Sequence, residues 1–235
     1  MITNDWLKKI ESRLLNYVIP RIENAIKKFD QTEVYSNDQF KWVGFLESHW
    51  EEIRDEFVEF HRTEDLIPSF HEVSPIQEWM TNDDKWKMLV LFAFGKKVSK
   101  TAGKFPRTMS HLRKVPGVKA AMFSIFEPNK HVQLHHGNVK MILRYQLGLI
   151  VPEPYKKCKI NINGSDYHWQ NGHSLLWDNT VPHEVWNESE GTRVVLMLDV
   201  MRQLPFPLNL LNKMAYKLIC RSDKIKNALV NLDET

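Results

Sequence analysis

A histidine and an arginine have the types and the spacing that a site for a metal ion and a small dicarboxylate requires. His183 and Arg193 lie in two apolar, β-branched runs that the polar turn Asn-Glu-Ser-Glu-Gly separates. This pattern predicts a β-hairpin over residues 181–200, in which the two side chains are diagonal neighbours, roughly 7–8 Å apart at the backbone. A metal-bound imidazole and a guanidinium at that separation can hold the two ends of one dicarboxylate.

Residues 139–151 form a long run that is typical of a strand, and they supply more of the predicted site. Arg144 and Gln146 share one face of this strand because side chains alternate between the two faces. Each would cost several kcal/mol if it were buried without a partner, so both are expected to line a polar pocket. His135, at the start of this run, is predicted to converge with His183 across a small barrel. These residues indicate a metal-dependent oxygenase that uses 2-oxoglutarate.

Several short segments between Val115 and Arg202 carry a resemblance to a known family. They are Phe123-Ser124-Ile125, His135-His136-Gly137, Leu143 to Leu149, Cys158-Lys159-Ile160, Trp177-Asp178, His183-Glu184-Val185-Trp186 and Arg193-Val194-Val195. The stretch resembles the aspartyl/asparaginyl β-hydroxylase family, a branch of the Fe(II)/2-oxoglutarate dioxygenases. The resemblance implies a catalytic set of His135, His183 and Arg193, with the two histidines as the iron ligands. It also implies that 2-oxoglutarate contacts Ser124, Arg144, Gln146 and Arg193.

Two positions depart from the usual pattern of these enzymes. Most 2-oxoglutarate oxygenases bind iron through His-x-Asp/Glu and a distant histidine, but Gly137 stands in the acid position here. Members of this family can have glycine there and bind iron through two histidines and water, which predicts weaker metal retention. Gln146 stands where the family usually has a histidine, and glutamine can donate a hydrogen bond but cannot become cationic.

The order of the predicted elements indicates a mainly β protein with flanking helices (α+β), built on a double-stranded β-helix, a cupin-like jelly roll. Residues 1–235 are predicted to form a single dioxygenase domain, with a helical region over 1–65, the jelly-roll core over 86–202 and a C-terminal helix within 205–235. The local patterns predict the following elements: helices starting at Asn4, within 40–60, over 106–112 and over 208–219, a strand over 86–94, and a tight hairpin turn at Asn163-Gly164.

The net charge, the cysteine count and the lengths of the apolar runs indicate which binding partners and which cellular location to expect. A net charge of +3 is too small to indicate nucleic-acid binding. Two cysteines do not make a disulfide framework, and no signal-peptide core or membrane-length apolar run is present. The protein is therefore expected in the cytoplasm, with association at the inner membrane surface as an open alternative.

Other histidines and acids of the chain are interpreted as structural. His136 would point away from His135 on an extended segment, and His131 and His168 are expected at the surface. Asp178 lies before Pro182 and is expected to serve in a turn rather than as a metal ligand. The basic run from Lys96 to Arg107 is expected to be a solvated face, with attraction of an acidic substrate as the alternative that the resemblance implies.

The expected substrate is an Asp or Asn side chain of a peptide or protein, with the acyl chain of a lipid as the alternative. The resemblance implies hydroxylation at the β-carbon of Asp or Asn side chains, but related bacterial hydroxylases act on the acyl chain of lipid A. An apolar stripe over residues 208–219 has lysines nearby. It either packs on the protein's own sheet or makes a peripheral contact with an anionic membrane. A non-catalytic metal-binding jelly roll is the alternative of a different class.

Overall fold

The structure is a computed structural model that describes residues 14–63, 66–74, 79–81 and 83–222, together with Ile225, Leu229 and Leu232. The helices are η1 (Leu14–Val18), α2 (Ile19–Phe29), η2 (Asn37–Gln39), α3 (Lys41–Glu47), α4 (Trp50–Thr63), α5 (Phe70–Val73), α6 (Ser99–Ala102), α7 (Pro106–Leu112), η4 (Tyr155–Lys157) and α8 (Leu208–Ile219). The strands are β1 (Val34–Tyr35), β2 (Trp86–Ala93), β3 (Lys96–Lys97), β4 (Val118–Phe126), β5 (Lys130–His135), β6 (Ile142–Ile150), β7 (Cys158–Ile162), β8 (Ser165–His168), β9 (Ser174–Trp177), β10 (His183–Asn187) and β11 (Arg193–Met201).

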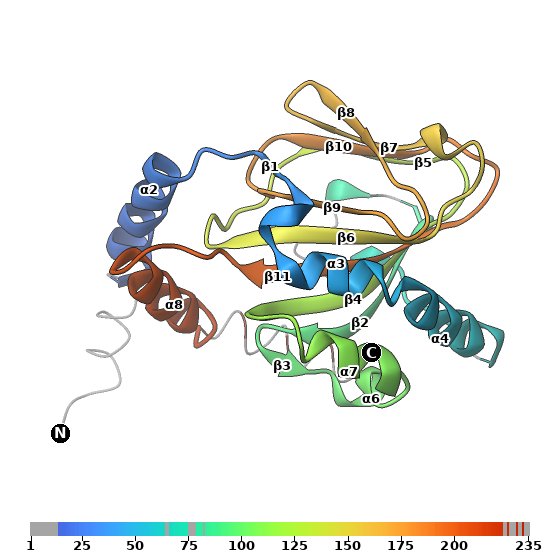
Figure 1. The fold of residues 1–235 in the computed structure, drawn as a ribbon, viewed down its shortest axis with the longest axis horizontal. Coiled ribbons are helices and arrows are strands. Elements are labelled where there is room, and N and C mark those ends of the chain that lie inside the picture. The colour runs from blue at the N-terminus through green and yellow to red at the C-terminus, as the bar shows by residue number, and fades with distance from the viewer. Residues whose placement is uncertain are drawn as a thin grey trace.

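Two antiparallel sheets face each other and form the centre of the molecule (Figure 1). The larger sheet has the strand order β1-β9-β6-β11-β4-β2-β3, and the smaller has the order β5-β10-β7-β8. Apolar side chains from both sheets meet between them, among them Val195 of β11, Ile160 of β7 and Val185 of β10. The predicted mainly β fold class with a jelly-roll core is therefore confirmed.

The larger sheet is covered on both faces, which explains why every residue of β11 is buried. Val195 and Met197 point towards the smaller sheet, whereas Val194 and Leu196 point to the opposite face. Helices α3, α4 and α7 cover that opposite face with large side chains: Trp42, Val43, Leu46, Ile53, Phe57, Phe60, Met109 and Leu112. Helices α2 and α8 lie together at one end of the molecule (Figure 1). Because helices cover the outer face of the larger sheet, the pocket lies on its inner face, between the two sheets.

Several local predictions are confirmed by the structure. Strand β2, helix α7 and helix α8 lie where their sequence patterns indicate. The turn between β7 and β8 places Asn163 at φ +47° and Gly164 at φ +88°, the left-handed conformations that a two-residue hairpin turn requires. The predicted capping residue Asn4 lies outside the described residues.

The predicted hairpin over residues 181–200 is wrong. Strand β10 pairs with β5 and β7 in the smaller sheet, whereas β11 pairs with β4 and β6 in the larger one. The connecting segment is therefore a corner that crosses between the sheets. Asn187 holds this corner, because its side-chain amide donates to the carbonyl oxygens of Phe126, Glu127 and Gly191 at 2.9–3.0 Å. The two amide hydrogens of Asn187 are thus shared among three carbonyl acceptors, which stabilises the crossing against hairpin closure.

Candidate active site

The two histidines lie side by side in the smaller sheet. His135 is the last residue of β5, and His183 is the first residue of β10, directly opposite it in the antiparallel register. Their ring centroids are 4.1 Å apart. The predicted convergence is thus present, although the histidines meet on neighbouring strands rather than across a barrel. His135 also ends a strand of its own instead of starting the strand that carries Arg144.

Both imidazoles are oriented by the backbone. His135 Nδ1 lies 2.8 Å from the carbonyl oxygen of Gln133, and His183 Nδ1 lies 2.8 Å from that of Val181. A carbonyl only accepts, so each Nδ1 carries the proton and each Nε2 keeps its lone pair. Carbonyl partners of this kind fix the tautomer of metal-binding histidines. The pair can therefore offer two nitrogen ligands to one metal ion.

Burial keeps these histidines neutral. Burial, and after it the neighbouring His135, together lower the pKa of His183 to about 3. The pKa of His135 is also lowered, mainly by burial. Neutral imidazole is the form that binds a metal ion, so the pair is ready for a metal without losing protons. Among the residues that the structure describes, no cluster of three or more His, Cys, Asp or Glu side chains could hold a metal ion.

Arg193 lies in the same pocket as the histidines, on the opposite sheet. Its side chain is 1% exposed and is flanked by the rings of Phe126 and Trp169, whose centroids lie 4.0 Å and 4.6 Å from the guanidinium carbon. Its Nε and Nη1 have no hydrogen-bond partner among the described residues. Burial lowers the pKa of Arg193 to about 10, which still leaves it cationic at neutral pH. A buried cation with free donors fits the carboxylate of a ligand.

The other predicted site residues also line this pocket, but their contacts differ. The amide oxygen of Gln146 has no partner, and its nitrogen lies 3.2 Å from the sulfur of Met197. Ser124 accepts a hydrogen bond from the indole of Trp86 at 3.1 Å. Arg144 forms a two-pronged pair with Asp199 at 2.9 and 3.0 Å, so two of its donors are already engaged. Gln146 and Ser124 are thus better placed than Arg144 to receive a new ligand.

Sequence patterns did not identify the aromatic walls of the pocket. Trp86 and Trp177 line it, and Trp169 stacks on Arg193 from outside the named strands. The abundance of tryptophan, eight in the chain, was the available signal. It could not assign them, because their positions depend on how the two sheets pack.

Gly137 occupies a position that has no room for a side chain. A Cβ atom placed there would lie 2.9 Å from Cγ of Asn179 and 3.0 Å from its carbonyl oxygen. The backbone N–H of Gly137 donates to that carbonyl at 2.7 Å, which fixes the two segments together. Steric exclusion by Asn179 therefore explains why no acidic ligand follows the histidine pair.

Replacing this glycine with alanine is expected to destabilise the protein. Gly137→Ala should cost about 1–3 kcal/mol because buried Asn179 must move to admit the new methyl group. The double variant Gly137→Ala/Asn179→Gly should recover part of the loss, since the side-chain overlap is then removed. Urea unfolding of the three proteins measures both effects. An unchanged free energy of unfolding for Gly137→Ala would show that Asn179 does not close this position.

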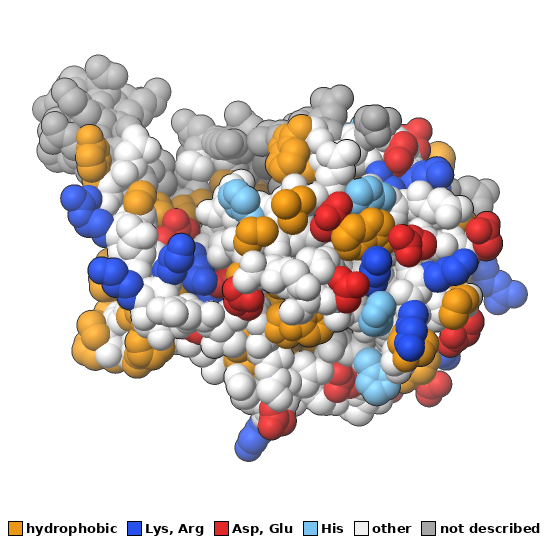
Figure 2. Space-filling model, turned by 90° about the horizontal axis from the view of Figure 1, so that it is seen from above, with side chains coloured by type: hydrophobic (Ala, Val, Ile, Leu, Met, Phe, Trp, Pro, Cys, Tyr) orange, Lys and Arg blue, Asp and Glu red, His pale blue; other side chains and the backbone are white. Residues whose placement is uncertain are grey.

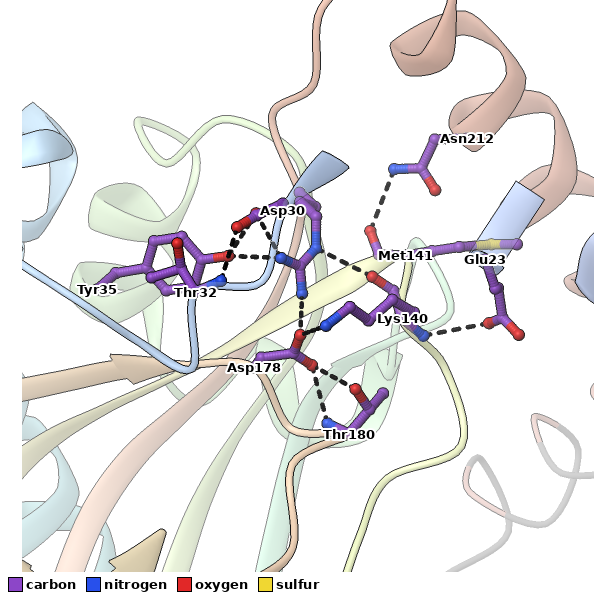
Figure 3. Close-up of polar contacts among 10 residues, drawn as sticks. Glu23, Asp30, Thr32, Tyr35, Lys140, Met141, Asp178, Thr180 and Asn212 are labelled. Atoms are coloured by element: carbon purple, nitrogen blue, oxygen red, sulfur yellow. Dashed lines mark hydrogen bonds and ion pairs between the residues drawn. The ribbon is translucent and has the colours of Figure 1, made fainter. Parts of the chain in front are cut away.

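A buried charge network supports the segment that precedes His183 (Figure 3). Arg202, 1% exposed, donates to Asp178 and to Asp30 at 2.6 Å each. Asp178 also pairs with Lys140 and accepts from the backbone and side chain of Thr180. The carbonyl of Asp178 accepts from the N–H of Val181, whose own carbonyl orients His183. Asp178 is therefore a turn residue, as the sequence predicted, and not a metal ligand.

A broad cleft opens beside the histidine pair. It is lined by Glu23, Lys27 and Lys28 of α2, and by residues next to the two histidines in the chain: His136, Gly137, Val181 and Pro182. Both signs of charge line this cleft. Because its lining includes chain neighbours of both histidines, this cleft lies beside the pocket.

Comparison with known proteins places this site in a family. The family model described as Aspartyl/Asparaginyl beta-hydroxylase matches residues 47–203. An ornithine lipid ester-linked acyl 2-hydroxylase of Rhizobium tropici is 35% identical over 207 residues, which cover 88% of this chain and 74% of that protein. The aspartyl/asparaginyl beta-hydroxylase of Homo sapiens is 28% identical over 164 residues, which cover 67% of this chain but 21% of that protein.

Among solved structures, a Pseudomonas putida prolyl-4-hydroxylase aligns with a TM-score of 0.44 at 13% identity, covering 66% of this chain and 88% of that chain. The family match is the stronger finding, because it spans most of the chain and includes every polar residue of the pocket. The chain therefore belongs to the aspartyl/asparaginyl beta-hydroxylase family.

Proposed function

We propose that this protein is an Fe(II)- and 2-oxoglutarate-dependent hydroxylase. The observation that carries the proposal is the buried guanidinium of Arg193, whose free donors lie in one pocket with two histidines that each keep an available Nε2. Two imidazole nitrogens suit iron, and a desolvated guanidinium suits the distal carboxylate of a dicarboxylic acid. Metal binding alone does not explain Arg193, because a buried guanidinium that lacks an anionic partner among the described residues is energetically costly.

Each residue of the pocket has a distinct task in this proposal. His135 and His183 would hold the iron, and Arg193 would bind and orient the distal carboxylate of 2-oxoglutarate, with Ser124 and Gln146 in reach of the same ligand. When bound, iron and 2-oxoglutarate would allow dioxygen to react: one oxygen atom would convert a C–H bond of the substrate to C–OH, and the other would oxidise 2-oxoglutarate to succinate and carbon dioxide. The apolar walls, which include Trp86, Phe126 and Trp177, would exclude water from the reacting centre.

Reconstitution with cosubstrate tests this proposal through Arg193. After anaerobic loading with Fe(II), the parent protein should release succinate when 2-oxoglutarate and oxygen are added. Arg193→Ala removes one partner of a desolvated charged pair at a cost of roughly 2–5 kcal/mol, so 2-oxoglutarate affinity should fall about 30-fold or more. Arg193→Lys should recover only part, because an ammonium lacks the planar fork.

The half-buried Arg54, which pairs with exposed Asp55 at the surface, provides the control. Arg54→Ala should leave 2-oxoglutarate affinity unchanged, and Arg193→Ala should leave Fe(II) affinity without cosubstrate nearly unchanged. Titration calorimetry under anaerobic conditions measures both affinities. Equal 2-oxoglutarate binding by the parent and Arg193→Ala would refute the proposed cosubstrate site and revive the non-catalytic metal barrel.

For the substrate, we propose the acyl chain of a lipid. Support comes from the Rhizobium tropici relative, an ornithine lipid ester-linked acyl 2-hydroxylase, whose similarity extends over most of both chains. The second candidate is a peptidyl Asp or Asn side chain, which the human relative supports over a shorter stretch. Succinate release stimulated by an amino-acid-containing acyl lipid, and not by a pool of Asp-containing peptides, is expected. The reverse result would assign the peptide substrate.

A further inference from the structure

Helix α8 has an inner face that is fully used in the fold. Leu208, Asn212, Ala215 and Ile219 follow one another at intervals of three and four residues, which places them on one side of the helix. This side packs against α2, whose Ile22 and Ile26 are buried in the same cluster. The amide of Asn212 donates to the carbonyl oxygen of Met141 at 3.2 Å. The fold therefore does not require apolar residues on the opposite side.

The outer side of α8 is nevertheless apolar and exposed. Leu210, Leu211 and Met214 are 52%, 43% and 59% exposed, and Phe206, just before the helix, is 83% exposed. Tyr17, from the neighbouring η1, is 62% exposed. We call these five residues the apolar end face. Single exposed apolar residues are ordinary, but several on one helix and its neighbour mark an interaction surface.

Basic side chains border the apolar end face. Lys213 and Lys217 lie three and seven residues after Leu210, and Arg221 lies seven residues after Met214, so all three share the outer side of α8 or its extension. All three are exposed. At the end of the molecule formed by α2 and α8, hydrophobic and basic side chains stand next to one another (Figure 2). Apolar residues flanked by lysines are typical of helices that lie in the interface of an anionic membrane.

We propose that the apolar end face and its basic border bind the surface of an anionic lipid bilayer. This inference rests on the proposed action on a lipid and adds the surface by which the protein reaches it. Leu210, Leu211 and Met214 would enter the headgroup region, while Lys213 and Lys217 contact lipid phosphates. None of the helices in the described part of the chain is long and apolar enough to span a bilayer, so the contact proposed is peripheral.

The position of α2 connects this face to the active site. One side of α2 packs on α8 through Ile22 and Ile26, and another side lines the broad cleft through Glu23, Lys27 and Lys28. A bilayer held against α8 would therefore lie one helix away from the cleft beside the histidine pair. A lipid headgroup carrying both charges would meet lysine and glutamate side chains there, while its acyl chain extends to the pocket.

Vesicle co-sedimentation tests the proposed face without any need for turnover. The protein of residues 1–235 should bind vesicles of phosphatidylcholine and phosphatidylglycerol better than phosphatidylcholine alone, and less as salt is raised. Lys213→Gln/Lys217→Gln should weaken binding about 25-fold, since each basic residue at the surface contributes about fivefold. Leu210→Ser/Met214→Ser should weaken it roughly tenfold or more by removing buried apolar area.

Matched variants elsewhere serve as controls. Lys156→Gln/Lys157→Gln, at the exposed turn before β7, and Leu66→Ser, at a leucine that is 93% exposed, should bind as the parent does. His183→Ala should also bind vesicles as the parent does, because vesicle binding does not require turnover. The vesicle assay can therefore support or contradict the proposed face even if the hydroxylase assay fails. Vesicle binding that is equal in the parent and Leu210→Ser/Met214→Ser would overturn the proposal. The proposal would also be overturned if the parent were a dimer and Leu210→Ser/Met214→Ser made it monomeric, because the apolar end face would then be a dimer interface.

Discussion

His183→Ala is expected to abolish both iron binding and turnover. The site offers two protein nitrogens, and Asn179 closes the position after His135-His136 where another ligand would stand. Losing one of two ligands leaves a single imidazole, which cannot retain a metal ion in competition with water. Anaerobic Fe(II) titration and succinate release measure the two losses, and circular dichroism checks that the variant is folded.

His136→Ala is the control for this prediction. His136 is adjacent to His135, but its Nδ1 lies near the carbonyl oxygen of Gly137 and it lines the broad cleft rather than the pocket. Its removal should leave iron affinity and turnover within a few-fold of the parent. If His136→Ala were as damaging as His183→Ala, the assignment of His135 as the first iron ligand would be wrong.

Arg202→Met is expected to cost about 3–5 kcal/mol of stability at neutral pH. Methionine fills much of the arginine volume, but buried Asp178 and half-buried Asp30 then lose the guanidinium that they share, and Asp178 keeps Lys140 as its remaining cation. Breaking a buried pair from one side is costly because the remaining charge stays desolvated. Arg54→Met, in an exposed pair with Asp55, should cost less than about 1 kcal/mol. Urea unfolding measures the difference between the two variants.

The cost of Arg202→Met should depend on pH in a defined direction. Burial raises the pKa of Asp178, but the charge of Arg202 and the Lys140 hydrogen bond outweigh it, so the pKa is lowered overall. A carboxyl with a lowered pKa in the folded state stabilises the protein above its unfolded pKa of about 3.9 and loses this effect as pH falls through the folded value. The difference between parent and Arg202→Met should therefore shrink as pH falls below about 4. A constant difference would assign the cost to packing alone.

Local sequence patterns predicted those elements whose conformation is decided by near neighbours. Strand β2 follows from a continuous apolar run, α8 from its helical apolar period, and the β7–β8 turn from Asn163-Gly164. Arg144 and Gln146 were predicted as pocket residues from their types, since an arginine or glutamine is costly in a jelly-roll interior without a partner. The roles of His135, His183 and Ser124 were implied by the family resemblance.

The assignment of strands to sheets could not be predicted in this way. Residues 181–200 have the local pattern of a hairpin, but the pairing of β10 and β11 with strands of different sheets, and the long-range bonds of Asn187, exist only in the assembled fold. The Arg202 network was also beyond sequence reasoning, because its acidic partners lie 24 and 172 positions away. Pairs at such separations depend on the assembled fold.

Because the chain crosses between the sheets at Asn187, the residues of the ligand site are divided between the two sheets. The histidines belong to the smaller sheet and Arg193 to the larger one, so a dicarboxylate held at both ends would bridge the two. Its affinity then depends on the spacing between the sheets, which core residues such as Ile160, Val185 and Val195 set. A core substitution that touches no ligand can thus weaken cosubstrate binding. Saturation by cosubstrate would in turn hold the sheets together, by about 2.7 kcal/mol at a hundredfold excess over Kd.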